Sequence, residues 1–100
     1  MSHPENDNPG SRIILKLFIS GASRNSVRAI NNIQKILEEH LKNRYTLSVI
    51  DIYQEKYVAQ QEQIIALPLL IRKFPLPERR LIGDMSNTMK VLDYLEISKD

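Results

Sequence analysis

The first half of the chain predicts strand, helix and strand from the order of its apolar and polar positions. Ile13 to Ile19 (IILKLFI) is apolar at nearly every position, as in a central strand covered on both faces. Ser26 to Lys42 has the period of an amphipathic helix, which Ser23 or Asn25 can cap. Tyr45 to Ile52 alternates apolar with polar residues and predicts a second strand, parallel to the first with a right-handed crossover. The helix is expected to bury the apolar stripe of Val27, Ile30, Ile33, Leu37 and Leu41.

The second half is expected to add a helix, two short strands and a final helix. Glu55 to Ile65 fits a helix by composition, and Leu69 to Phe74 and Arg80 to Ile82 fit strands joined by the segment PLPE. Ser86 to Ile97 fits a helix that Ser86 caps. The resulting order, βαβ-α-ββα, predicts an α/β fold of the thioredoxin-like type. The residues of the last helix expected to face inward are Met89, Leu92 and Leu95 or Tyr94.

Length and composition narrow the class of protein. One hundred residues make one domain, which we place at residues 12–100 behind a polar, disordered tail of residues 1–11. The absence of cysteine excludes disulfides, thiol redox chemistry and cysteine metal sites. No run approaches the ~18 apolar residues of a membrane span and no signal peptide is visible, so a soluble cytoplasmic protein is expected. No catalytic constellation, cofactor loop or metal site is visible, and neither His3 nor His40 has a ligand nearby in sequence.

Residues 66–84 (ALPLLIRKFPLPERRLIGD) combine an apolar run, three prolines and two basic dipeptides. Each proline fixes its own φ angle and lacks a backbone donor, so this part of the backbone has few low-energy routes. Pro68 fits a tight turn before a strand or a binding role. The basic residues fit a solvated hairpin edge or a protein contact; nucleic-acid binding is disfavoured, because the net charge is only +2 and Phe74 is the only aromatic residue close by. The prolines are Pro68, Pro75 and Pro77, and the basic residues are Arg72, Lys73, Arg79 and Arg80.

Three smaller features point to contacts. Tyr53 and Tyr57 fit an interface, where tyrosine is enriched. The run 64–67 (IIAL) is too apolar for a solvent loop, so it belongs either to the core or to a hydrophobic contact with a partner. One ion pair is expected, between Arg28 and either Asp51 or Asp84.

Several segments spread over residues 13–95 together resemble the KaiB family. They are LKLFISG, NSVRAI, IQKILEEHLKNRYTLSVIDI, ALPLL, and PLPERRLIGDMSN with MKVL. Either NSVRA or RR-L-IGD-x-S-N alone would be weak, but the combination is specific. The resemblance implies a protein with two folds. One is thioredoxin-like and monomeric, and the other keeps the first βαβ unit, rearranges the second half and assembles as dimers and tetramers.

The resemblance also implies where the two folds exchange. The rearrangement falls in the proline-rich stretch of residues 66–84, and two acceptable packings of one sequence must differ by only a few kcal/mol. Because concentration favours association, the oligomeric arrangement is the one expected in the structure. The positions assigned to the switch are Pro68, Pro75, Pro77, Gly83, Asp84 and Tyr94.

The implied function is that of a regulatory protein without catalytic activity. Its implied partner is a KaiC-type RecA-like ATPase, with a KaiA-like protein or a histidine kinase as further candidates. The expected contact surface joins Gln63, Ile65 and Pro68 to the basic residues of the 72–80 stretch. A second surface is expected along the edge strand 45–50, which includes Thr46 and Ser48, by strand addition.

The chain also departs from the family pattern. Ala22 to Arg24 replace a Thr-Pro pair, Ser48 and Gln63 replace lysines used with partners, and Tyr94 replaces a glycine. These departures indicate a divergent paralogue. They motivate a second hypothesis, a standalone adapter in a stress response that no longer binds the ATPase. A nucleic-acid-associated protein is the third and weakest hypothesis.

Overall fold

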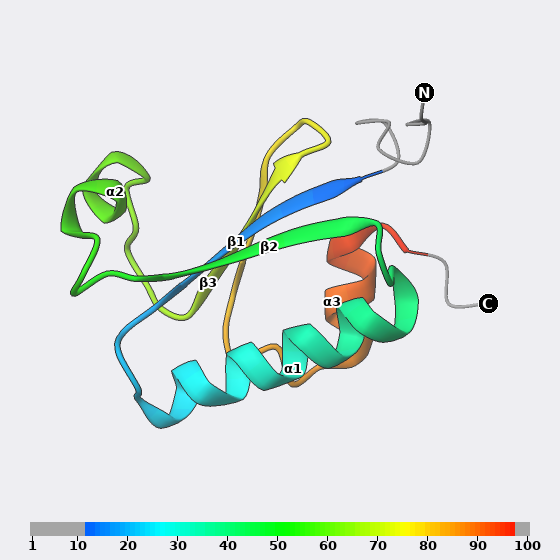
Figure 1. Cartoon of the computed structure of the whole chain (residues 1–100), viewed down its shortest axis with the longest axis horizontal. Helices are drawn as coiled ribbons and strands as arrows, with labels where there is room; N and C mark the ends of the chain where they lie inside the picture. The colour runs from blue at the N-terminus through cyan, green and yellow to red at the C-terminus, as the bar shows by residue number, and fades with distance from the viewer. Residues whose placement is uncertain (1–11, 98–100) are drawn as a thin grey trace.

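The computed structural model describes residues 12–97, in which one four-stranded mixed sheet has the strand order β2-β1-β3-β4 (Figure 1). β1 runs parallel to β2 and antiparallel to β3, and β4 pairs antiparallel with β3. The parallel pairing of the first two strands confirms the βαβ unit expected from the sequence. The strands are β1 (Ile13–Ile19), β2 (Tyr45–Asp51), β3 (Leu69–Phe74) and β4 (Arg79–Ile82). The tail predicted at residues 1–11, which includes His3, lies outside the described residues.

The helices are α1 (Arg24–His40), α2 (Lys56–Gln61) and α3 (Thr88–Leu95). Figure 1 shows α1 and α3 on the same side of the sheet and α2 beyond the end where β2 stops and β3 starts. The element order is βαβ-α-ββα, which confirms the thioredoxin-like alternative. The expectation of the oligomeric arrangement was wrong for this structure. In the thioredoxin-like arrangement a single chain buries its own apolar residues, so no second copy is needed to close the core.

The main core lies between the sheet and the helices α1 and α3. Leu15 and Leu17 of the central strand are fully buried against Ile33 and Leu37 of α1 and Leu92 of α3. The predicted stripes are confirmed at Ile33, Leu37 and Leu41 of the first and at Leu92, Tyr94 and Leu95 of the second, but each fails at its first position. In α1, Ala29 and Ile36 are also buried, and Val27 is exposed. In α3, Val91, Tyr94 and Leu95 are buried, and Met89 is exposed.

Side chains that bond to backbone amides set where two of the helices begin. Ser23 caps α1 as predicted, because its hydroxyl accepts a hydrogen bond from the Ser26 amide at 3.2 Å. For α3 the predicted cap was wrong: Asn87, and not Ser86, accepts from the Lys90 amide at 3.1 Å, so the helix begins at Thr88. α2 is shorter than predicted and ends before Gln63, whose φ angle of +54° lies in the left-handed region.

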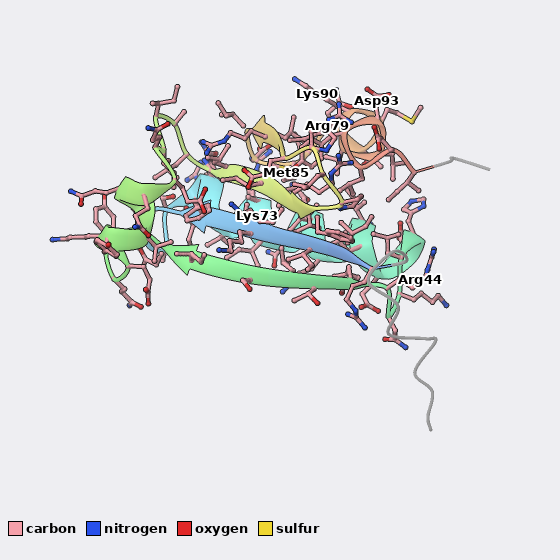
Figure 2. All side chains as sticks on the ribbon, turned by 90° about the horizontal axis from the view of Figure 1, so that it is seen from above. Arg44, Lys73, Arg79, Met85, Lys90 and Asp93 are labelled. Atoms are coloured by element: carbon pink, nitrogen blue, oxygen red, sulfur yellow. The ribbon has the colours of Figure 1, made fainter. Side chains whose placement is uncertain are left out.

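A smaller apolar cluster lies on the opposite face of the sheet. Phe18, Leu69 and Ile71 are buried there against residues of β2, α2 and the two loops that flank α2. The residues packed against them are Ile50, Ile52, Val58, Ile64 and Leu67. We call the face under α1 and α3 the closed face, and the face that carries Phe18 and Ile71 the open face. Figure 2 looks down on the open face, with α1 behind the strands and α2 at one end.

Candidate functional site

The strand register sorts the predicted contact residues between the two faces. Residues opposite each other in neighbouring strands point to the same face. Lys16 pairs with Ser48 on one side and with Ile71 on the other, and Ile71 pairs with Arg80. Because Ile71 belongs to the cluster on the open face, Lys16, Ser48 and Arg80 share that face, and so does Thr46, two residues before Ser48. The open face therefore gathers the predicted contact residues Thr46 and Ser48 of β2 and Arg80 of β4.

Arg72 and Arg79 lie on the closed face instead. Arg72 pairs in register with Leu15 of the main core and with Arg79. The Arg72 side chain is only 1% exposed, so the expectation of a solvated or partner-facing residue was wrong at this position. A guanidinium can be buried here because two acceptors receive its hydrogen bonds, a Glu96 carboxylate oxygen at 3.1 Å and the Pro77 carbonyl at 2.8 Å.

The same carboxylate serves both arginines. Arg79 donates to the Tyr94 carbonyl at 2.9 Å and to the second Glu96 oxygen at 3.4 Å, and its guanidinium lies 5.6 Å from the centre of the Tyr94 ring. Among the described residues, the Nε atom of Arg72 is the one buried side-chain polar atom without a hydrogen-bond partner. This cluster fixes the end of α3 to the β3–β4 hairpin.

Carboxylates also pair with Lys73 and Arg80, although these two residues were expected to face solvent or a partner. The Lys73 ammonium lies 2.7 Å from Glu78 and 3.1 Å from Glu62, and Arg80 lies 3.7 Å from Glu62. The hydrogen bond to Glu78 raises the pKa of Lys73, although burial opposes the shift, and the same bond lowers the pKa of Glu78. The basic stretch is thus largely neutralised within the fold.

The apolar run 64–67 was expected to belong either to the core or to a contact with a partner, and its residues differ in this respect. Ile64 and Leu67 pack against the small cluster of the open face, while Ile65 is 91% exposed. Beside Ile65 is an apolar hollow of about 280 Å³. Tyr53 and Tyr57 are exposed, as an interface role requires. The hollow is lined by Ile52, Ala59, Ile64, Ile65, Ala66 and Leu67.

β2 is an edge strand, as strand addition requires. In the sheet of the described residues it pairs with β1 alone, so its outer side has no strand partner. Thr46, Ser48 and Val49 are exposed along it. At the start of the strand, Arg12 donates to the Thr46 hydroxyl at 3.2 Å.

The positions assigned to a change of fold lie in ordered turns and in the core. Asp84 pairs with Arg28 at 3.1 Å, which confirms the expected ion pair, and hydrogen bonds from Ser86 lower the pKa of Asp84. Tyr94 is buried, which raises the pKa of its phenol, and its hydroxyl lies 2.8 Å from the Arg79 carbonyl and 3.2 Å from that of Leu70.

The remaining switch positions are a glycine and the prolines. Gly83 has a φ of +130°, which favours glycine, and its amide donates to the Pro68 carbonyl at 3.0 Å. The peptide bonds before Pro68, Pro75 and Pro77 are cis. The role of all these positions in a change of fold stays a prediction.

Residues 12–97 contain neither a cluster of metal-binding side chains nor a membrane-spanning helix. No group of three or more His, Cys, Asp or Glu side chains in this range could hold a metal ion. In the same part of the chain, no helix has the length and apolar character needed to cross a membrane.

Solved structures place the fold in the thioredoxin-like class. The N-terminal domain of SasA from Synechococcus elongatus aligns with a TM-score of 0.69 at 18% identity, covering 86% of this chain and 85% of that one. The thioredoxin Deadhead of Drosophila melanogaster aligns with a TM-score of 0.71 at 8% identity, covering 90% of this chain and 84% of that one. At these identities the likeness shows the fold alone.

Sequence relatives identify the family within that class. The KaiB domain model matches residues 16–97. The circadian clock protein KaiB3 of Synechocystis sp. is 45% identical over 87 residues, which are 87% of this chain and 85% of the relative. The circadian clock oscillator protein KaiB of Synechococcus elongatus is 42% identical over 89 residues, 89% of this chain and 87% of the relative. The chain therefore belongs to the KaiB family, as its sequence segments indicated.

Proposed function

We propose that this protein is a regulatory module of a circadian clock or a related timing system. In this proposal it has no catalytic activity, binds a KaiC-type RecA-like ATPase and modulates the phosphorylation and ATPase cycle of that partner. The observation that carries the proposal is the identity of 42–45%, over 87–89% of the chain, with proteins named as circadian clock proteins. A KaiA-like protein or a histidine kinase is a further candidate partner.

The contact surface that we propose combines the open face with the loop after α2. Ile65, with the apolar hollow beside it, would supply the hydrophobic contact, and the exposed Gln63 would flank it. Pro68, which was also expected to contact the partner, is buried and lies outside this surface. The exposed edge of β2, with Thr46 and Ser48, would add a second contact by strand pairing. Arg72 is excluded from this surface by its burial, and the charge of the remaining basic residues is met by carboxylates.

We further propose that the thioredoxin-like arrangement is the state that binds. A dimer or tetramer in the alternative KaiB arrangement would then be a storage form, and the apparent affinity would fall with the fraction of competent chains. Complex formation at the first time point would indicate that the competent state predominates. Complex formation over hours would indicate that most chains begin in the storage form.

Co-elution tests the proposal directly. The purified protein is mixed with the KaiC-type ATPase of the same genome and with nucleotide, and the mixture is followed on a sizing column for a day. Ile65→Ser should weaken the complex, whereas the matched change Met89→Ser, at an exposed apolar residue of α3, should not. Restoring the family lysines with Ser48→Lys and Gln63→Lys should strengthen it. The absence of a complex at high micromolar concentration would refute the proposal.

That negative result would favour the standalone adapter in a stress response. The observation behind this second candidate is that Ser48 and Gln63 carry no charge where the family has lysines that contact partners. The salt dependence of binding distinguishes a nucleic-acid-binding protein from both candidates. Contacts with phosphates make the logarithm of the binding constant fall steeply with the logarithm of the salt concentration. Ion pairs of Lys73, Arg79 and Arg80 with carboxylates argue for a shallow slope.

A further inference from the structure

Glu62, the residue that follows α2, is held by both strands of the β3–β4 hairpin. Its carboxylate lies 3.1 Å from the Lys73 ammonium and 3.7 Å from the Arg80 guanidinium. Arg80 also donates to the main-chain carbonyl of Glu62 at 2.5 Å. The Glu62 side chain is only 16% exposed, so these contacts are shielded better than an ordinary surface ion pair. One residue is thus fixed through its side chain and its backbone.

The other end of the loop is fixed by apolar packing. Ile64 and Leu67 pack against the small cluster on the open face. Between the two anchors Ile65 remains 91% exposed, although its isoleucine side chain gains nothing from that position in the isolated protein. Gln63, with its φ of +54°, turns the chain between the first anchor and this run. The loop therefore holds an apolar side chain in solvent on an ordered backbone.

The charges around Glu62 are balanced within the protein itself. Lys73 is shared between Glu62 and Glu78, and Arg80 shares Glu62, so two cations face two carboxylates. An acidic partner would have to displace a carboxylate to reach either cation. The geometry favours an internal role for these basic residues over direct recognition of a partner.

We propose that Glu62, Lys73 and Arg80 form a clamp that holds residues 62–67 in one conformation and thereby presents Ile65 to the partner. This inference has two parts. The first, loop ordering, is that the clamp holds residues 62–67 in one conformation, and it does not depend on the proposed function. The second, presentation, is that the ordered loop offers Ile65 to the partner, and it rests on the proposed function. Ordering the loop before the encounter removes a conformational entropy penalty from association. Glu62 is thus a positioning residue, which acts through Ile65.

Backbone relaxation in the free protein tests the loop-ordering half. Glu62→Gln removes the charge with little change in shape, and Glu55→Gln removes the same charge at the other end of α2, where the side chain is exposed. The amide order parameters of residues 64–66 should fall from about 0.85 towards 0.6 or below in Glu62→Gln. They should stay unchanged in Glu55→Gln, and those of β1 should stay unchanged in both. Wild-type order parameters in Glu62→Gln would overturn the clamp.

A binding cycle with the ATPase tests the presentation half. Glu62→Gln should weaken binding by roughly two- to fivefold, the upper part of the range for an ion pair near the surface. The double variant Glu62→Gln/Ile65→Ser should bind no more weakly than Ile65→Ser alone, because loop order matters only while Ile65 is present. If the two substitutions weaken binding additively, the proposal that the clamp presents Ile65 to the partner is wrong. If the wild-type protein does not bind the ATPase, presentation fails together with the proposed function, whereas the relaxation data still decide whether the clamp orders the loop.

Discussion

Removing the charge of Glu96 should destabilise the protein by an amount set by the buried guanidinium of Arg72. Arg72 is 1% exposed, and its buried guanidinium donates to one Glu96 oxygen at 3.1 Å and to the Pro77 carbonyl. Leaving a buried charge without its counter-ion costs about 3–5 kcal/mol. The Glu96 side chain, however, is 63% exposed, so water screens part of the interaction. We therefore expect Glu96→Gln to cost about 1.5–3 kcal/mol of unfolding free energy.

Urea unfolding at neutral pH, followed by far-UV circular dichroism, measures this loss. Asp93→Asn is the matched control, because it removes the same charge from an exposed position of α3 for which no side-chain partner is found among residues 12–97. For a domain of this size, each kcal/mol corresponds to a shift in the melting temperature of roughly 4–8 °C. Glu96→Gln should therefore melt well below Asp93→Asn, and an equal unfolding free energy in the two variants would refute the reasoning.

The reverse perturbation separates charge from packing. Arg72→Met replaces the buried cation by an apolar side chain of similar length, and such replacements are often neutral or stabilising. Glu96 would still pair with Arg79. Adding Glu96→Gln to Arg72→Met should then cost less than Glu96→Gln costs alone. Two equal costs would show that Arg72 does not depend on Glu96.

The remaining predictions concern the backbone, a buried hydroxyl and acid stability. Lys42 is exposed with a φ of +43°, so Lys42→Gly should stabilise by about 0.5–1 kcal/mol, whereas Lys35→Gly in the interior of α1 should destabilise by about 1 kcal/mol, both measured by urea unfolding. Tyr94→Phe removes a buried hydroxyl that bonds to backbone carbonyls and should cost about 1 kcal/mol in the same assay. Hydrogen bonds from Ser86 hold the pKa of Asp84 below its ordinary 3.8, so the stability they provide is complete above that pH and is lost as the pH falls through the folded pKa. Asp84→Asn should flatten the decline of unfolding free energy with acid below about pH 4; an unchanged decline would contradict this.

The elements of the fold could be predicted because their signals are local. The βαβ unit and the Ser23 cap follow from periodicity and capping preference. The Arg28–Asp84 pair joins segments that are distant in sequence, and residue type alone left it open between Asp84 and Asp51. The start of α3 could not be predicted, since Asn87 and Ser86 are both good caps and only the path of the turn decides between them. The choice between two arrangements of the second half was predicted wrongly, because it depends on packing between segments that are distant in sequence.

The basic stretch shows why the candidate site was only partly predictable. Arg72 and Lys73 are neighbours in sequence, yet a strand sends adjacent side chains to opposite faces, so one is buried and the other lies on the open face (Figure 2). Arg72 pairs with Glu96, 24 residues away, and Lys73 pairs with Glu62, 11 residues away, in addition to the nearby Glu78. No local sequence pattern indicates a pairing over such separations. The pairs form because the fold brings these distant residues next to one another.

The open face itself is a consequence of element lengths. β1 was predicted to be covered on both faces because nearly every position is apolar, but Ile14 is 38% exposed and Lys16 is half-buried. A helix of six residues, such as α2, is about 9 Å long, whereas a strand of seven residues, such as β1, spans about 23 Å. α2 therefore covers Phe18 at one end of the strand and cannot reach the other. Beside the uncovered length lie Thr46 and Ser48 of the edge strand, whose polar side chains suit an edge that no strand covers.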